Sequence, residues 1–400
     1  MQIEFEYWWL LVLPLFFTLG WLAARVDIKQ LLAESTTLPA TYFKGLNFLI
    51  SNQLDKAVEA FSEAVIANTD SLELHFALGS LFRRTGETDR AINMHLNLLD
   101  KKELTVNQKS AVKAELAQDY LKAGLYDRAE ELFLGLDDTR YRQSALHSLL
   151  EIYVREREWT QSVTTATELE RLSGISFRVS IAQYYCELAM ENIIAQKPDD
   201  AKKDLLLALD ANKNCVRANV LLGDIEAEAA DHQKAISYWK RIEYQKPEFL
   251  GLIANKMLKS YRADKKLKDG LSQLHTYLES YKQASIMSTL YEATLAEEGA
   301  EKAAKLARNE LIRQPSLATL DQLLQARAMA DESKNQTGQQ DIQLMQQTVR
   351  NAIGNRAAYH CNQCGFRAKQ YHWQCPACNA WESLPAEPTE ALSREITITK

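Results

Sequence analysis

The sequence repeats at intervals of 34 residues over most of its length, and this period constrains the fold more than any other feature. Glycine, alanine and large side chains recur at the same places of successive units. Three copies place them as Gly45, Ala57 and Phe61, as Gly79, Ala91 and His95, and as Gly223, Ala235 and Trp239. A unit of this length cannot bury its apolar face alone. The period therefore indicates a stacked array in which each unit packs against its neighbours.

The spacing resembles the tetratricopeptide repeat, a unit of two antiparallel helices. Small residues at positions 8 and 20 of each unit should let the two helices approach, and large residues at positions 11 and 24 should fill the seam. A proline such as Pro247 should end the second helix. Thr41 to Pro315 holds about eight units, with Ser162 and Gly270 replacing the expected alanine in degenerate copies. We predict an all-α superhelix, and a content of only 14 glycines and 8 prolines agrees with it.

A superhelix of this kind presents a groove lined by the first helix of each pair, and such grooves typically dock peptides or proteins. The alternative is a spacer that holds the C-terminal region at a fixed distance from the membrane. Further helices are predicted at Leu317–Asp331 and Asp341–Ile353. Cys186 and Cys215 fall in or beside repeat helices, and we expect both to be buried as small apolar side chains.

The first part of the chain is strongly apolar. Tyr7 to Ala24 contains 18 residues without a charge, which is just long enough to cross a bilayer as a helix. Three tryptophans lie near its ends, where aromatic rings favour the membrane interface. A cleaved signal peptide would need a basic N-terminus, whereas this one carries Glu4 and Glu6. A buried core helix is the other alternative. We predict a transmembrane anchor.

The charges that flank this segment predict its orientation. Arg25 and Lys29 follow the span, and no basic side chain precedes it. The positive-inside rule then places the rest of the chain on the cytoplasmic side of the membrane, as a single-pass protein.

Four cysteines near the C-terminus form two CxxC pairs, Cys361 with Cys364 and Cys375 with Cys378. Two such turns can complete a tetrahedral four-sulfur site for one metal ion, and zinc and iron share that geometry. Gly365 and Asn379 follow the two pairs, where a positive φ would turn backbone N–H groups towards sulfur. The aromatic residues of the tail are expected to form a miniature core, and they are Phe366, Tyr371, Trp373 and Trp381.

Other interpretations of the cysteines fit less well. A c-type haem needs a histidine directly after the second cysteine of a pair, and Gly365 and Asn379 stand there. A thioredoxin-like pair needs a βαβ unit, and disulfides conflict with a reducing compartment. His360 and His372 are alternative ligands, although four thiolates already complete a site.

Charge and motifs limit the classes of function. The net charge of −6 argues against a general nucleic-acid binder. No acidic residue lies between Asp341 and Glu382, so the tail is a small basic island, with Arg350, Arg356, Arg367 and Lys369. The chain has no Walker A loop and no GxGxxG, GxSxG or HExxH motif, so no enzymatic activity is expected.

The resulting division of the chain has six parts. We expect a transmembrane anchor at 1–25, a linker at 26–40, the repeat array at 41–316, further helices at 317–354, a four-cysteine metal-binding domain at 355–385 and a tail at 386–400.

This order of span, repeats and terminal CxxCG…CPxCN pair covers essentially the whole chain. It resembles the lipopolysaccharide assembly protein B family of Gram-negative inner membranes. The tail is similar to that family's rubredoxin-like domain, with Cys361, Cys364, Cys375 and Cys378 matching its metal ligands. It is shorter than true rubredoxins, and Asn379 replaces the glycine usual in their loops.

The resemblance implies a regulatory adaptor rather than an enzyme. Members of the family act with the membrane protease FtsH and promote turnover of the lipid A pathway deacetylase, which limits lipopolysaccharide synthesis. An inner-membrane protein of the PbgA type counteracts them. The alternatives are a rubredoxin-type electron carrier, a general membrane-tethered assembly scaffold and a tethered zinc ribbon for nucleic acid. No nucleic-acid partner is expected, and a homo-oligomer is left open.

Overall fold

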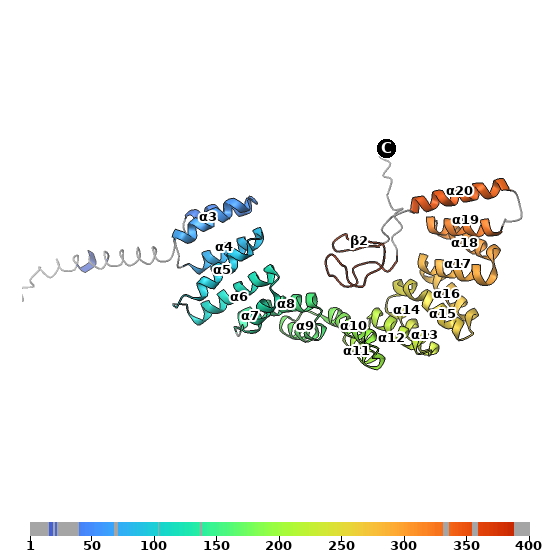
Figure 1. The fold of residues 1–400 in the computed structure, drawn as a ribbon, viewed down its shortest axis with the longest axis horizontal. Coiled ribbons are helices and arrows are strands. Elements are labelled where there is room, and N and C mark those ends of the chain that lie inside the picture. Colours follow the sequence, from blue (N-terminus) through green and yellow to red (C-terminus); the bar gives the residue numbers. More distant parts are fainter. Residues whose placement is uncertain are drawn as a thin grey trace, which may run out of the picture. The chain divides into compact units, whose positions relative to one another are not determined.

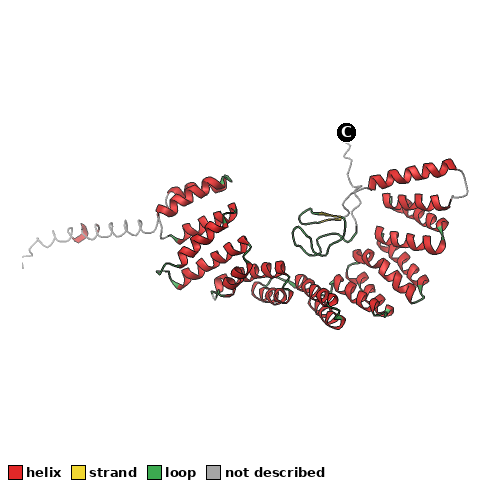
Figure 2. Ribbon diagram, viewed as in Figure 1, coloured by secondary structure: helices red, strands yellow, loops and turns green. Residues whose placement is uncertain are grey.

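A computed structural model describes residues 16–18, 21, 40–67, 71–102, 104–136, 138–330, 336–353 and 359–387. The predicted transmembrane anchor and linker lie outside these residues, except for 16–18, 21 and 40. Among the described residues, no helix is long and apolar enough to cross a membrane. The described part is almost entirely helical, and its two short strands lie near the C-terminus (Figures 1 and 2). The predicted all-α class is confirmed.

The chain forms two compact units, Met1–Glu156 and Arg157–Lys400, here called the first and second unit. The helices of the first unit are α2 (Ala40–Ile50), α3 (Leu54–Ala67), α4 (Leu72–Thr85), α5 (Thr88–Leu99), α6 (Val106–Ala123), α7 (Tyr126–Leu134) and α8 (Thr139–Glu156). Consecutive helices pack against each other, as α2 does on α3 and α4 on α5.

The second unit continues the pairs and adds the C-terminal domain (Figure 1). Its helices are α9 (Trp159–Ser173), α10 (Arg178–Ile194), α11 (Pro198–Ala211), α12 (Val216–Glu228), α13 (His232–Lys240), α14 (Ile242–Gln245), the 3₁₀ turn η1 (Pro247–Phe249), α15 (Leu250–Ala263), α16 (Leu267–Tyr281), α17 (Ala284–Glu298), α18 (Ala300–Arg313), α19 (Leu317–Ala330) and α20 (Gln336–Ile353). The strands β1 (Tyr359–His360) and β2 (Arg367–Ala368) form an antiparallel hairpin.

Close approach of the two helices in a pair depends on glycine. A Cβ atom added to Gly223 would lie 2.2 Å from the indole nitrogen of Trp239, and one added to Gly45 would lie 2.6 Å from the Phe61 ring. Gly79 is equally close to His95, at 2.5 Å. No real Cβ contact is this short, so only glycine fits. The predicted packing of a small residue against a large one across the seam is confirmed.

The second small position of each unit is fully buried. Five alanines there have an exposed fraction of 0%, and they are Ala57, Ala91, Ala129, Ala201 and Ala235. In the degenerate copies Ser162 is equally buried, and its hydroxyl donates to the carbonyl of Glu158 at 2.9 Å, so burial leaves no unpaired polar group. At the other degenerate copy, a Cβ on Gly270 would meet Tyr261 at 2.9 Å.

Local signals explain where helices begin and end. Thr105 and Gln108 form a capping box at the start of α6, and Gly124 ends that helix with a φ of 77°. Pro247 opens η1 directly after α14, as expected of a residue that cannot continue the helix. α20 begins at Gln336 rather than at the predicted Asp341, because the glutamine-rich run before Asp341 is itself compatible with a helix.

The seam generates a testable prediction. Replacing Gly223 with Ala should lower the stability of the full chain by about 1–3 kcal/mol, because Trp239 is fully buried and cannot move away from the new methyl group. The gain in helix propensity of about 1 kcal/mol offsets only part of this loss. Thermal unfolding followed by circular dichroism measures it. The matched control, Ser237→Ala, lies on the exposed face of α13 and should leave the melting temperature unchanged. Equal melting temperatures for both variants would contradict the tight packing of Gly223 against Trp239.

Candidate metal centre

The first CxxC pair lies in a tight loop at the tip of the β1–β2 hairpin. The N–H of Cys361 donates to the carbonyl of Phe366 at 2.8 Å, and the N–H of Gly365 donates to the carbonyl of Cys361 at 3.0 Å. Gly365 has a φ of 73°, which confirms the predicted left-handed conformation. This turn directs both thiols to the same side of the loop.

The second pair repeats the same backbone path. The N–H of Cys375 donates to the carbonyl of Ala380, and the N–H of Asn379 donates to the carbonyl of Cys375, both at 2.9 Å. Asn379 has a φ of 58°, so asparagine adopts here the conformation that glycine has in the first loop. An isolated bridge between Gln374 and Trp381 closes the loop. Two equivalent loops therefore face each other.

The four sulfurs form one cluster. The sulfurs of Cys361 and Cys378 are 3.7 Å apart, as are those of Cys364 and Cys375, and all four lie within 4.8 Å of one another. A tetrahedral ion with bonds of about 2.3 Å to sulfur needs its ligands about 3.8 Å apart. The cluster fits one metal ion, as predicted. Within the described residues this cluster contains no histidine, so His360 and His372 do not contribute.

The pKa values of two of the thiols are shifted in opposite directions, by hydrogen bonding in one case and by crowding in the other. The hydroxyl of Ser383, 3.3 Å from the sulfur of Cys361, and nearby backbone N–H groups lower the pKa of Cys361 to about 6. The backbone N–H of Phe366 favours the thiolate of Cys364, but desolvation and the neighbouring thiols outweigh it and raise the pKa of Cys364 to about 12. One thiolate forms readily, whereas several together need a cation to balance their charge.

Aromatic stacking attaches this domain to the repeat array. The ring of Phe249, at the end of η1, is parallel to that of Trp373 at a centroid distance of 5.5 Å, and Tyr371 meets Phe249 edge-on at 6.1 Å. Phe249 is buried. Trp373 meets Tyr371 edge-on at 5.1 Å within the domain, as predicted, and it also packs against the array. A domain this small gains burial from its neighbour.

An ionic contact lies on the same face. The carboxylate of Glu382 accepts a hydrogen bond from Gln183 of α10 at 2.8 Å and pairs with Lys246. The neighbouring Trp381 meets Tyr184 edge-on at 6.3 Å, and the guanidinium of Arg217 from α12 lies 5.7 Å from its ring centroid. The domain therefore contacts the first helices of successive pairs.

The contact extends past the predicted end of the domain at residue 385. Ala386 is buried against the core of the second unit, and Glu387 accepts hydrogen bonds from the backbone and hydroxyl of Ser285 at the start of α17. Desolvation raises the pKa of Glu387, although its bonds with Ser285 oppose the shift. Residues assigned to the tail on sequence grounds thus belong to the docking contact.

Sequence reasoning missed these docking residues. Glu382 carried one signal, because it is the first acid after the long acid-free stretch that begins at Asp341. No feature of the sequence pointed to its partners Gln183 and Lys246. Within the basic island, Arg350 pairs with Asp321 of α19 at 3.0 Å, and Arg367 is exposed.

The remaining two cysteines are buried, as predicted. Cys186 and Cys215 are both 0% exposed, and their sulfurs lie 3.7 Å apart in the core of α10–α12. They are separate from the metal cluster and serve as packing residues.

Comparison with known proteins finds the same two parts. A rubredoxin metal binding domain model matches residues 359–386, and a tetratricopeptide repeat model matches 44–100 and 192–248. Lipopolysaccharide assembly protein B of Escherichia coli K12 is 31% identical over 376 residues, covering 94% of this chain and 96% of that protein. The Haemophilus influenzae protein of the same name is 30% identical over 391 residues, with the same coverage. Among solved structures, MamA is 17% identical and covers 43% of this chain and 92% of its own, with a TM-score of 0.30.

The helix pairs and the four-cysteine cluster define a tetratricopeptide-repeat protein with a rubredoxin-type metal domain. The family follows from sequence identity of at least 30% with the relatives above, over nearly the full length of both compared chains. The chain belongs to the lipopolysaccharide assembly protein B family.

A cysteine substitution tests the metal centre. Cys375→Ser should reduce bound metal from one ion per chain to nearly none and make residues 359–387 sensitive to protease, because the thiolate shell supplies much of the folding free energy of so small a domain. Metal analysis and limited proteolysis measure both effects. Cys186→Ser removes another fully buried cysteine and should retain the ion. Full metal content in the Cys375 variant would contradict the assignment.

A second substitution tests the docking contact. Phe249→Ala should leave metal content unchanged but accelerate amide hydrogen exchange in residues 371–382 by about tenfold, because it removes the stacked partner of Trp373. Tyr244→Ala is the control, since that aromatic ring is 87% exposed only five positions earlier. Equal exchange rates in the two variants would show that the stacking does not hold the domain.

Proposed function

We propose that this chain is a non-enzymatic adaptor that regulates lipopolysaccharide synthesis at the inner membrane. In this proposal it promotes proteolysis of the lipid A pathway deacetylase by the membrane protease FtsH. An inner-membrane protein of the PbgA type counteracts it. The observation that carries the proposal is the match to lipopolysaccharide assembly protein B over 94% of the chain.

The architecture supports an adaptor. Stacked helix pairs expose a long surface on which another protein can dock, and the metal domain lies against the first helices of several pairs through Phe249 and Glu382. In the proposed division, the array occupies 41–316, the further helices 317–354 and the metal domain 355–385, with the docking contact reaching Glu387. Cys361, Cys364, Cys375 and Cys378 are the proposed ligands of one zinc or iron ion.

The proposed anchor explains how weak contacts suffice. The uncharged segment at 7–24 would hold the array on the cytoplasmic side, with the N-terminus in the periplasm. A tether confines the adaptor to the plane in which a membrane protease works, which raises their effective concentration without any additional contact.

An electron carrier is the second candidate, because the four-sulfur cluster could hold iron. The contact between the metal domain and the array favours a structural role, since Trp373 and Trp381 pack on protein. Redox titration of protein purified without added metal separates the two, and zinc as the sole metal would remove the electron carrier.

Depletion in cells tests the adaptor role. Loss of the protein should lengthen the half-life of the lipid A pathway deacetylase several-fold, because the protease then lacks the adaptor that brings it its substrate. Pulse–chase labelling with immunoprecipitation measures the half-life, and another FtsH substrate serves as the control. If depletion leaves the deacetylase half-life as it was, the proposed regulation is wrong.

A further inference from the structure

Three cations occupy the same place in three alternate helices of the first unit. Arg84, Lys122 and Arg155 are the next-to-last residues of α4, α6 and α8 respectively. All three line one groove of about 800 Å³, here called the basic groove. The regular repeat thus places three positive charges along a single surface.

Two of these charges lack a counterion. Glu151 is the acidic side chain among the residues that line the basic groove, and it pairs with Arg155 at 2.7 Å. Arg84 and Lys122 are exposed and pair with no acid in the described part of the chain. The basic groove therefore carries uncompensated positive charge.

Stabilisation of helix ends does not account for this pattern. A cation in the last turn favours any helix, so the same residues would be expected throughout the array. In the second unit, however, the equivalent places hold Ile193, Ala227 and Glu297, while Arg262 pairs with Glu297 at 2.9 Å. Among the described helices, uncompensated cations at this position are confined to the first unit.

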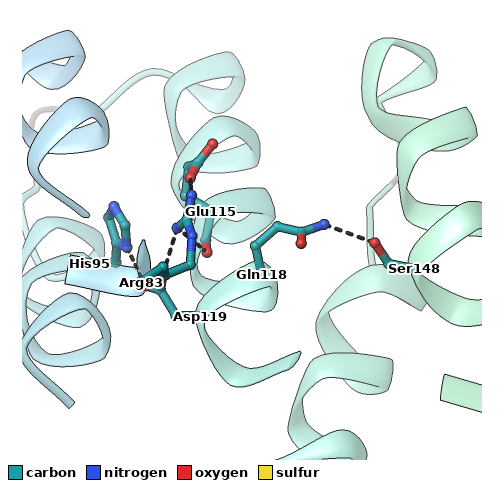
Figure 3. A network of polar contacts seen from close by, with 6 residues as sticks. All are labelled: Arg83, His95, Glu115, Gln118, Asp119 and Ser148. Carbon is teal, nitrogen blue, oxygen red and sulfur yellow. Dashed lines mark hydrogen bonds and ion pairs between the residues drawn. The ribbon is translucent and has the colours of Figure 1, made fainter. Parts of the chain in front are cut away.

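A polar network lies beside the basic groove and reaches it through Arg83 (Figure 3). Arg83 donates to Asp119 and to Glu115, both at 2.6 Å, and Asp119 also bonds His95 at 2.5 Å. Asp119 and His95 are both 0% exposed. Arg83 lines the groove, but its charge is balanced by Glu115 and Asp119. The network joins α4, α5 and α6, so two of the helices that carry the cations are fixed relative to each other.

Gln118 extends the hydrogen bonding to α8. Its amide nitrogen donates to the hydroxyl of Ser148 in α8 at 2.8 Å (Figure 3), and its side chain also lines the basic groove. All three helices that carry the cations are thus joined by side-chain hydrogen bonds. Because the helices are already joined, binding would have to order only the exposed side chains and not the helices that carry them.

We propose that the basic groove binds an acidic, extended polypeptide segment. Guanidinium and ammonium groups would bind its carboxylates, and Arg84, which pairs with no acid among the described residues, can do so through two parallel hydrogen bonds. Leu54, Leu121 and Tyr126 also line the groove and would contact apolar side chains of the same segment. This mixture suits a peptide better than a bare phosphate. The inference rests on the proposed function only in taking the array to be a docking module.

Peptide binding to the full chain in a neutral detergent tests the proposal. The probe is a fluorescent 12-residue peptide that alternates Glu with Leu and Ser, and its matched copy has Gln for every Glu. The acidic peptide should bind in fluorescence anisotropy, and the Gln copy should not. The triple variant Arg84→Gln, Lys122→Gln, Arg155→Gln should weaken binding by at least about tenfold.

The matched control removes the same charge elsewhere. Lys109→Gln, Lys113→Gln, Lys259→Gln changes three exposed cations outside the groove and should retain affinity. Equal affinity of both triple variants would overturn the proposal, as would binding to phosphatidylglycerol vesicles with none to the peptide. If the peptide does not bind but depletion lengthens the deacetylase half-life, the proposed groove is wrong and the adaptor role stands. If the peptide binds but depletion leaves the half-life unchanged, the adaptor role is wrong and the groove stands.

Discussion

The close approach of paired helices is the constraint on which the array depends. Gly45, Gly79 and Gly223 each face a large side chain 16 positions later in the sequence, at distances that leave no room for a methyl group. Because the helices of a pair meet along glycine and buried alanine, they lie close together. Each pair then stacks on the pair before it and on the pair after it. Both helices of a pair keep exposed positions, and in the second unit the row of first helices is the surface on which the metal domain docks.

The metal domain makes use of that row because it cannot stabilise itself through burial alone. Its two loops bring four thiols together, and Trp373 and Trp381 lie against the array. Adjacent residues couple the two contacts, since Ser383 lies beside the sulfur of Cys361 while Glu382 binds Gln183 and Lys246. The cysteine cluster and the contact with the array therefore meet at two adjacent residues of the chain.

Features with a local pattern could be predicted from the sequence, and features that join distant segments could not. Positive φ at Gly365 and Asn379 and the small residues of the seam follow from spacing alone. Gln183 and Glu382 are 199 positions apart, and no periodicity relates them. His95 shows a different limit. It occupies a place expected to be large and apolar, and only the structure reveals its partner Asp119.

The two units use their helices differently. In the second unit a domain of the same chain contacts α10, α12 and α17 near their N-terminal ends, through Gln183, Arg217 and Ser285. In the first unit the last turns of α4, α6 and α8 carry the basic groove, and side-chain hydrogen bonds join these helices. A surface occupied within the molecule adds rigidity, whereas an accessible and charged one favours binding of another molecule. The same repeat architecture thus forms both the support for the metal domain and the proposed docking site.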